Sequence, residues 1–347
     1  MFDPQFHITN SILKNIGTIE AAREVIGDAP LLPLWEKKFR DDAIVRTAHH
    51  GTHVEGNRLN LSEAKDVLLG RDVIGRSRDV QEVINYRKTL QMIEDEAEKG
   101  AEKITEQVIK KLHRYTTDRI LPSEEVGEYR TKKVIIRNSA TGEITFRPPA
   151  PLEVPFLMRE FVYWLNKTTP NDVHPVLKAG IAHHQLAAIH PFIDGNGRVS
   201  RALSTLVLFT EGYDIRRFFS LEEYYDRDAI EYYKHLNMAS EGNMAGWLDY
   251  FVLGVAMEFD RVKKQVLKLS KDTYLKEKLG GKQVFLTERQ TRLIEYIQSI
   301  GYLQNQMFGD AAPDVSEDTI LRDVQELIDK GIIKKVGKTK GARYEMV

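Results

Sequence analysis

The amino-acid sequence predicts a mainly α-helical protein, and three observations lead to this fold class. Apolar residues recur every three or four positions over most of the chain, which is the spacing of one helix face. Runs that favour β-strands are confined to residues 134–146 and 332–346. With 347 residues, 42% of them hydrophobic, the chain can bury a sizeable core in two or three domains.

Four regions follow from the apolar pattern and the turn residues. Residues 1–100 are expected to form an N-terminal helical region, and residues 101–260 a second helical region with one β-hairpin. Residues 261–283 are rich in lysine and end in Gly280-Gly281-Lys282, which indicates a helix or linker. Residues 284–347 are expected to be a separate module. Within the first region, helices are expected at residues 12–25, 35–55, 61–69 and 78–98.

The C-terminal module has the element order of a winged helix-turn-helix, which it resembles. Helices are expected at residues 288–299, 305–308 and 316–330, followed by strands at 332–336 and 342–346. Such modules often bind DNA, and the wing between Lys330 and Arg343 carries only basic charged residues.

The third helix of this module argues against DNA as the partner. It carries Arg322 and Lys330 against five acidic residues, namely Glu317, Asp318, Asp323, Glu326 and Asp329. Such a balance repels phosphates. DNA binding therefore stays open but is not favoured, and a role in homodimerisation or in recruiting a target protein is preferred.

The most informative segment is His190-Pro-Phe-Ile-Asp-Gly-Asn-Gly-Arg-Val-Ser-Arg201. Its glycines let the backbone aim successive N–H groups at an anion, and the helix that follows offers its N-terminus to phosphate. Arg198 and Arg201 share one stripe of that helix and can reach neighbouring phosphates. Asp194 is a hard-oxygen ligand suited to Mg²⁺ on those phosphates.

His190 is the candidate general base. It follows a predominantly apolar helix expected at residues 176–189 and precedes Pro191, which biases it away from helical backbone. The ordinary pKa of histidine, about 6.5, suits proton transfer near neutral pH. The segment therefore combines a phosphate-binding turn with a base.

This segment resembles the H-x-F-x-D/E-G-N-G-R-x-x-R signature of the Fic family at every specified position. The resemblance implies a Fic-type helical core and transfer of AMP from ATP to a protein hydroxyl, with pyrophosphate leaving. His190 would then deprotonate the target Ser, Thr or Tyr, and Asp194 would hold Mg²⁺. Phe192 would anchor the loop in the core.

The resemblance also implies how the nucleotide is held. Gly195, Asn196 and Gly197 would form the anion hole. Arg198 would bind the β-phosphate and Arg201 the γ-phosphate. Positioning and charge neutralisation dominate this kind of chemistry, so the implied roles agree with the residue types.

An upstream segment, Gly51-Thr52-His53-Val54-Glu55-Gly56-Asn57, resembles the inhibitory helix S/T-x-x-x-E-G/N of many Fic proteins. There the glutamate pairs with the second arginine of the active-site motif and blocks the γ-phosphate, which implies a Glu55–Arg201 pair. Gly51 stands where Ser or Thr is expected, and Thr52 is the candidate substitute. From the residues alone, Gly56 is a good end for a helix, and a carboxylate there benefits from a cationic partner.

Two further segments have expected binding roles. Val134–Ile136 and Ile144–Phe146 flank Asn138–Gly142, which predicts a hairpin. By resemblance this hairpin is the flap that docks the target by strand pairing, and Ile135, Ile136 and Thr145 are its candidate residues.

Tyr233 lies in a segment that resembles the Tyr-Tyr segment of Fic proteins bordering the adenine, with Ser240 where Asn is common. Tyr233 is a candidate to stack on the base. A core role fits a tyrosine at helical spacing equally well.

Composition narrows the class of protein. A net charge of −1 predicts no pervasive attraction to nucleic acid. The chain has no cysteine, so disulfides and thiolate metal sites are excluded, and a reducing cytoplasm is expected. Neither a signal peptide nor a membrane span is expected from the apolar runs.

The sequence thus predicts an autoinhibited protein adenylyltransferase that uses ATP and Mg²⁺ on an unidentified protein substrate and is able to modify itself. Two alternatives remain open. One is a hydrolase that removes AMP at the same site with the help of Glu55. The other is a DNA-binding regulator whose Fic core senses a nucleotide.

Overall fold

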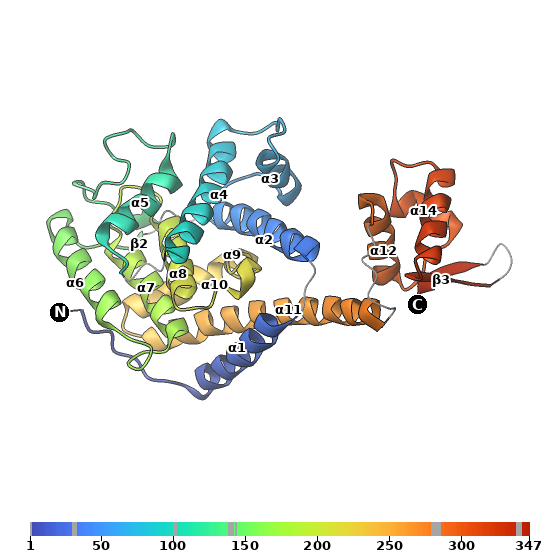
Figure 1. Cartoon of the computed structure of the whole chain (residues 1–347). Coiled ribbons are helices and arrows are strands. Elements are labelled where there is room, and N and C mark those ends of the chain that lie inside the picture. Colours follow the sequence, from blue (N-terminus) through green and yellow to red (C-terminus); the bar gives the residue numbers. More distant parts are fainter. Residues whose placement is uncertain are drawn as a thin grey trace. The chain divides into compact units, whose positions relative to one another are not determined.

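The computed structural model describes residues 2–29, 33–99, 103–137, 142, 144–278, 286–337 and 342–347 (Figure 1). The chain divides into two compact units, Met1–Leu267 and Lys268–Val347. Most described residues are helical, which confirms the predicted fold class. None of the described helices combines the length and hydropathy that crossing a bilayer requires.

The first unit begins with four helices: α1 (Asn10–Asp28), α2 (Pro33–His53), α3 (Leu61–Leu68) and α4 (Ser77–Glu98). Their ends follow local capping chemistry. The Thr9 side chain accepts a hydrogen bond from the Ile12 N–H at the start of α1, and Asn60 and Glu63 form a capping box at the start of α3. Helix α2 ends two residues before Glu55.

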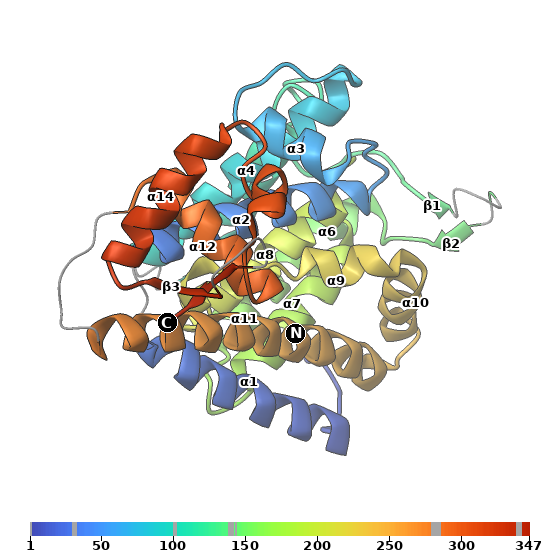
Figure 2. The same ribbon diagram turned by 90° about the vertical axis from the view of Figure 1, so that its right-hand side faces the viewer.

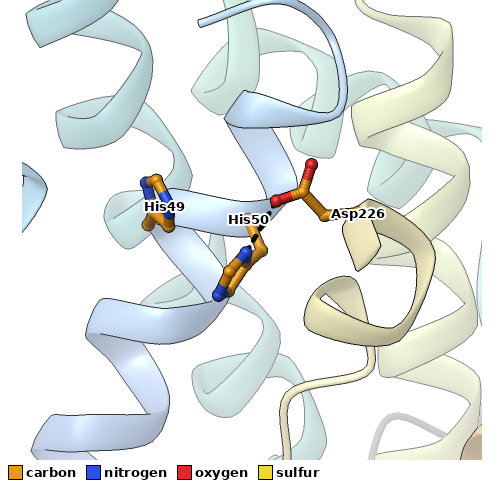
Figure 3. A group of neighbouring side chains, drawn as sticks. All are labelled: His49, His50 and Asp226. Atoms are coloured by element: carbon orange, nitrogen blue, oxygen red, sulfur yellow. Dashed lines mark hydrogen bonds and ion pairs between the residues drawn. The ribbon is translucent and has the colours of Figure 1, made fainter. Parts of the chain in front are cut away.

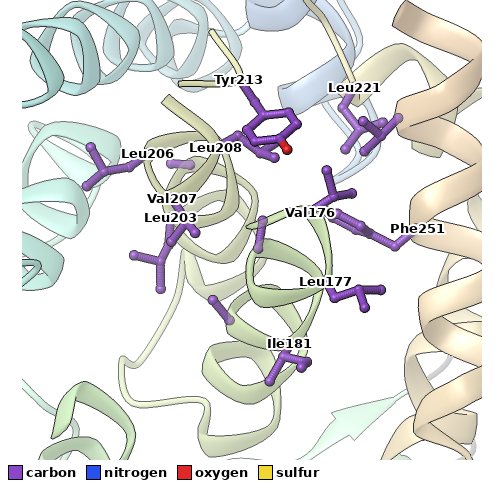
Figure 4. Packing of buried hydrophobic residues seen from close by; sticks show 14 of the residues in the cluster. Val176, Leu177, Ile181, Leu203, Leu206, Val207, Leu208, Tyr213, Leu221 and Phe251 are labelled. Carbon is purple, nitrogen blue, oxygen red and sulfur yellow. The ribbon is translucent and has the colours of Figure 1, made fainter. Parts of the chain in front are cut away.

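The centre of the first unit is the helix pair α7 (Pro175–Ile189) and α8 (Asn196–Thr210). Nearly every residue of both helices is buried, including polar and charged residues of α8 such as Arg198 and Arg201. Figure 4 shows side chains from α7, such as Ile181, beside those from α8, such as Leu203. Helices α5 (Glu106–Thr117) and α6 (Val154–Lys167) pack around this pair.

Three further helices complete the first unit: α9 (Glu222–Arg227), α10 (Ala229–Ser240) and α11 (Met244–Lys278). Residue 260, where the sequence analysis ends the second region, lies inside α11. The helix continues because Val262 and Val266 extend its buried face. The expected linker end at Gly280-Gly281-Lys282 lies outside the described residues.

The hairpin consists of β1 (Ile136–Arg137) and β2 (Ile144–Phe146), which pair antiparallel with Ile136 opposite Phe146 (Figure 2). The first strand starts later than expected, so Val134 and Ile135 precede it. Residues 138–141 of the predicted turn lie outside the described residues.

The second unit contains α12 (Glu288–Ile300), α13 (Phe308–Ala311), α14 (Glu317–Asp329), β3 (Ile333–Val336) and β4 (Arg343–Met346). Strands β3 and β4 pair antiparallel, and Leu303 forms an isolated bridge with Tyr344 of β4. The helices pack on a separate apolar cluster that includes Leu293, Val324 and Leu327. Residues 338–341 of the expected wing turn lie outside the described residues.

Candidate active site

The candidate site is built where α7 ends and α8 begins. His190 caps α7 in the left-handed region, with φ 51° and ψ 57°, and its N–H still donates to the Leu186 carbonyl. This conformation turns the chain sharply out of the helix, in agreement with the expectation that His190 leaves the helical region. We call residues 190–197 the anion loop.

The ring of His190 is oriented by its own helix. Its Nδ1 lies 3.3 Å from the Ala187 carbonyl oxygen, so Nδ1–H donates and Nε2 is left as the acceptor. The pKa of His190 is lowered to about 4, mainly by burial and in smaller part by the charge of Arg130. The imidazole is therefore neutral at neutral pH and has a weaker affinity for a proton than the ordinary value used in the sequence analysis.

Hydrogen bonds within the anion loop and packing against His113 hold its conformation. The Asn196 side chain donates to the Phe192 carbonyl and accepts from the Phe192 N–H, both at 2.9 Å. Phe192 is fully buried and stacks on His113 with ring centroids 3.9 Å apart. His113 in turn lies 3.1 Å from the Asp194 carbonyl oxygen through Nε2 and accepts the Gly127 N–H at Nδ1. These contacts fix the backbone of the loop that the sequence predicts to bind an anion.

Two glycines in the loop are required for different reasons. Gly195 adopts φ 78°, which an L-side chain rarely adopts, and it is the N-cap of α8. At Gly197 an added Cβ would lie 2.2 Å from Glu55 Oε1. The carboxylate of Glu55 thus packs directly against the start of α8, where the helix dipole favours negative charge.

Asp194 and Arg198 belong to a charged network with residues of α4. Asp194 accepts from Arg78 at 2.8 Å, and Arg198 lies 3.1 Å from Glu82 and 3.6 Å from Asp194. Burial raises the pKa of Asp194, but Arg198, the Gly195 N–H and Arg78 outweigh this effect, so the pKa is lowered and the carboxylate stays ionised. Arg198 Nε makes no hydrogen bond within the described residues, whereas NH1 is paired with Glu82. Nε is therefore the Arg198 donor available to a phosphate.

Arg201 and Glu55 face each other. Arg201 is 1% exposed, and its NH2 group lies 2.9 Å from Glu55 Oε1 and donates to the Gly51 carbonyl at 2.9 Å. Its Nε and NH1 are buried and have no hydrogen-bond partner among the described residues. The Glu55 side chain is 28% exposed. An ATP phosphate bound to Arg201 and the Glu55 carboxylate would need the same guanidinium.

Gly51 leaves room for a neighbouring aromatic ring. An added Cβ would lie 2.6 Å from Tyr86 Cε1 and 3.2 Å from Glu222 Cγ. The Tyr86 hydroxyl donates to Glu222 at 3.0 Å, and burial raises the pKa of Glu222. Thr52 does not replace the missing hydroxyl as a link to another helix, because its recorded bonds go to Ala48 and His49 of its own helix.

The hairpin joins the site through Arg130. Its guanidinium donates to the His190 carbonyl at 2.7 Å and to the Pro149 carbonyl at 2.7 Å, so it ties both ends of the hairpin segment to the anion loop. In the hairpin, Ile135 is exposed, Ile136 is partly buried and Thr145 is exposed. The Thr145 hydroxyl donates to the Ile136 carbonyl across the strands.

The adjacent residues Tyr232 and Tyr233 differ in burial, which separates a core role from a role in stacking on the base. Tyr232 is buried, and its hydroxyl lies 2.9 Å from His183 Nε2, so it is a core residue. Tyr233 is 39% exposed and donates to the Val54 carbonyl, next to Glu55. Its ring is therefore accessible from the site.

Sequence reasoning missed several residues that shape the site: Arg78, Glu82, Tyr86, His113 and Glu222. Most lie on α4 and α5, far from the motif in sequence, and read as ordinary helical residues. The sequence carries no signal for them, because the buried face of α4 also includes Asp79, Asn85 and Thr89. The burial of Glu82 and Glu222, which are 5% and 2% exposed, is apparent only in the structure.

Comparison with known proteins agrees with this geometry. Residues 103–208 match the Fic/DOC family. The chain is 32% identical over 213 residues to a protein named protein adenylyltransferase Fic from Drosophila grimshawi, covering 60% of this chain and 40% of that protein. A protein of the same name from Nematostella vectensis is 28% identical over 240 residues, covering 67% of this chain and 52% of that protein. The chain thus spans about half or less of the length of these relatives.

A solved structure shares the fold. The crystal structure of a Fic family protein from Desulfovibrio desulfuricans G20 aligns with a TM-score of 0.68 at 24% identity, covering 100% of this chain and 98% of that chain. The motif from His190 to Arg201 lies within the matched segment. Residues 103–208 of this chain are therefore similar to Fic domains in sequence, and the chain shares the fold of a Fic family protein.

Proposed function

We propose that the protein is an adenylyltransferase that moves AMP from ATP to a Ser, Thr or Tyr hydroxyl of a protein. The observation that carries the proposal is the placement of a neutral His190 at the start of the anion loop. Arg198 and Arg201 follow the loop, and the buried Nε of each makes no hydrogen bond within the described residues. The name shared by the relatives from Drosophila grimshawi and Nematostella vectensis supports the same activity.

The chain supplies a general base and two cationic phosphate ligands for this reaction. His190 Nε2 takes the hydroxyl proton, since Nδ1 is engaged with Ala187. The hydroxyl oxygen forms a bond to the α-phosphorus while the bond to the bridging oxygen breaks, and pyrophosphate leaves with that electron pair. Arg198 and Arg201 bind the β- and γ-phosphates and stabilise the leaving charge.

Asp194 fits a role in holding Mg²⁺. Its carboxylate is ionised and 41% exposed at the mouth of the loop, and Mg²⁺ is commonly held by one carboxylate together with substrate phosphates. Arg78, which pairs with Asp194 at 2.8 Å, has to release this carboxylate for the ion. The bound ion would neutralise charge on the phosphates.

We further propose that Glu55 inhibits the transfer. Its carboxylate pairs with the Arg201 guanidinium, to which the γ-phosphate would bind, and packs against Gly197. Tyr233 would border the adenine, and the exposed edge at Ile135, Ile136 and Thr145 would dock an extended segment of the target. We also expect the protein to modify itself when Glu55 no longer pairs with Arg201.

The proposal is tested with α-labelled ATP and cell lysate as the source of protein substrates. Glu55→Gly is expected to label proteins more strongly than the wild type, because Arg201 is then available to ATP. His190→Ala is expected to label none. Equal labelling by the wild type and Glu55→Gly would contradict the inhibitory role, and full labelling by His190→Ala would contradict the reaction.

Removal of AMP is the second candidate, because the Glu55 carboxylate lies in the site and its charge acts on His190. In that case Glu55 would position a water for attack on the AMP–protein bond. AMP release from a pre-modified protein that depends on Glu55 would favour this direction of the chemistry.

For the second unit we propose winged-helix-type dimerisation or target recruitment rather than DNA binding. Asp323 forms an ion pair with Arg289 of the same unit, at 2.8 Å. The other acidic residues of α14 are exposed, namely Glu317, Asp318, Glu326 and Asp329. They repel phosphates. A gel shift by the full chain that weakens with salt would instead favour a DNA-binding regulator. The absence of cysteine agrees with placing the protein in the cytoplasm.

A further inference from the structure

A cluster of histidines lies at the end of α2, outside the site described above. His50 Nδ1 lies 2.7 Å from one oxygen of Asp226, and His53 Nδ1 lies 2.7 Å from the other. The ring of His49 is 4.6 Å from that of His50 and 5.3 Å from that of His53, measured between centroids. Figure 3 shows His49 and His50 on α2 and Asp226 on α9.

The donor atoms of this cluster already converge. One ligand atom from each of His49, His50 and Asp226 lies within 4.8 Å of the other two. A tetrahedral zinc ion with bonds of about 2.0–2.2 Å separates its ligand atoms by about 3.3 Å. The 2.7 Å His50–Asp226 contact therefore has to open by about 0.6 Å to admit the ion. The His49 donor lies within 4.8 Å of the other two, so it has to approach them by up to about 1.5 Å.

The three candidate ligands are also sheltered from solvent. His49 is 7% exposed, and the side chains of His50 and Asp226 are 19% and 8% exposed. An ion held between them would therefore exchange much of its water for protein ligands.

We propose that His49, His50 and Asp226, with His53 at the rim, form a binding site for a divalent transition-metal ion such as Zn²⁺. Two imidazoles and one carboxylate are a common zinc-binding set, with a fourth position left for His53 or water. When the ion binds, the proton on His50 Nδ1 moves to Nε2, because a neutral imidazole presents either nitrogen to a metal.

The site connects two elements that matter for inhibition. His49, His50 and His53 lie in the last turn and a half of α2, and Glu55 follows two residues after His53. Asp226 lies on α9, the helix that begins with the buried Glu222. An ion bound between α2 and α9 restrains the segment that carries Glu55, so we expect it to favour the Glu55–Arg201 pair. This consequence rests on the proposed function, whereas the metal site itself does not.

Metal binding is tested on the full chain after treatment with a chelator, by titration calorimetry with ZnCl₂ and by the visible absorption of bound Co²⁺. We expect one ion per chain, and at least about tenfold weaker binding in His50→Gln and in Asp226→Asn, as seen when groups supporting a metal are removed. The exposed His7→Gln and the active-site Asp194→Asn are the controls, and both are expected to bind zinc as the wild type does.

Two results would overturn the site. One is zinc binding that is absent in the wild type, and the other is binding that is equal in wild type, His50→Gln and Asp226→Asn. Thermal unfolding of each metal-free variant checks that the fold is retained. His53→Gln, at a half-exposed position, is a milder variant that is expected to weaken zinc binding less than His50→Gln.

The regulatory consequence is tested with the labelling assay, with and without zinc. We expect zinc to lower labelling by the wild type several-fold and to leave His50→Gln unchanged. Glu55→Gly is expected to bind zinc with normal affinity but to keep its labelling. An equal loss of labelling in Glu55→Gly would contradict the link to inhibition. An absence of labelling in every variant would contradict the proposed function, while the calorimetry would still decide the metal site.

Discussion

The two partners of the Arg201–Glu55 pair are held in very different ways. Arg201 is 1% exposed within α8, and the anion loop beside it is closed by Asn196, Phe192 and His113. Glu55 is 28% exposed and lies beyond the end of α2. Separation of the pair leaves the Arg201 charge buried and uncompensated, which is costly. The open form therefore requires another anion, such as a phosphate, at Arg201. We therefore call Arg201 and the anion loop the fixed half, and we propose that Glu55, the blocking half, is the part that moves.

Apolar and polar contacts together hold the blocking half. Ala48 and Val54 are buried in apolar clusters, and ion pairs flank them. Arg46 of α2 pairs with Glu223 at 2.7 Å and Glu258 at 2.9 Å, and Asp226 binds His50 and His53. Partly exposed ion pairs contribute about 0–1 kcal/mol each. Several such pairs stabilise the inhibited position only moderately, which is the range in which a ligand or partner can shift it.

The largest effect is expected when the fixed half loses its base. In a Glu55→Gly background, His190→Ala should lower labelling by about 10²–10⁴-fold, the usual contribution of a general base. ATP binding should be retained, because the arginines are untouched. Labelling with α-labelled ATP checks this, with His7→Ala in the same background as the control. A loss below tenfold would assign the base elsewhere.

Substitution of His113 tests whether its contacts stabilise the anion loop. His113→Ala removes the stack on Phe192 and the contacts to Asp194 and Gly127. We expect a loss of about 2–4 kcal/mol in the free energy of unfolding, from the cavity and the unpaired backbone groups. Urea unfolding measures the stability, and labelling should fall with it. Unchanged stability with lower activity would mean that His113 acts on the chemistry directly.

Gly197→Ala tests whether Glu55 lies on the anion loop in solution. The new methyl group would meet Glu55 Oε1 at 2.2 Å, so in the wild type it should cost about 1–3 kcal/mol through overpacking. In the Glu55→Gly background it should cost less by about 1 kcal/mol, because the nearest atom is gone. Unfolding of the four proteins of this double-mutant cycle gives the coupling. A coupling energy of zero would place Glu55 away from the loop.

Glu222 gives the smallest expected effect, in the dependence of stability on pH. Its pKa is raised by burial above the ordinary value of 4.5, so the folded state binds a proton more tightly than the unfolded state. This contribution is present at pH below 4.5 and is lost as pH rises through the folded pKa. Glu222→Gln keeps an acceptor for Tyr86 and does not titrate.

The stability of Glu222→Gln relative to the wild type should therefore increase between about pH 5 and about pH 8. Urea unfolding at both pH values measures the difference, and Glu241→Gln at an exposed position is the matched control. A relative stability that falls over this range would contradict the raised pKa.

Sequence predicted the helical fold and most element positions, because helix periodicity and capping are local. It also identified the motif from His190 to Arg201, because all its residues are contiguous. It placed Ile135 in a strand that begins at Ile136, since propensity does not set register. Arg78, Glu82 and His113 were missed because their contacts with Asp194, Arg198 and Phe192 are long-range.

Gly51 shows the limit of pattern comparison most clearly. Sequence alone marks it as a departure from the inhibitory pattern, with Thr52 as the candidate substitute. The structure gives the physical reason, since the Tyr86 ring occupies the space that a side chain at residue 51 would take. The Gly51 carbonyl instead accepts a hydrogen bond from Arg201 at 2.9 Å. Such compensation between α2 and α4 is visible only in three dimensions.

The most direct test of the central claim, that Glu55 competes with the ATP γ-phosphate for Arg201, is calorimetric binding of ATP and AMP to the wild type and to Glu55→Gly. Removing a competing ion pair worth about 1.4 kcal/mol changes affinity tenfold. We expect Glu55→Gly to bind ATP about tenfold more tightly or better, and to bind AMP, which has no β- or γ-phosphate, with unchanged affinity. Equal ATP affinity in the two proteins, or an equal gain for AMP, would contradict the claim.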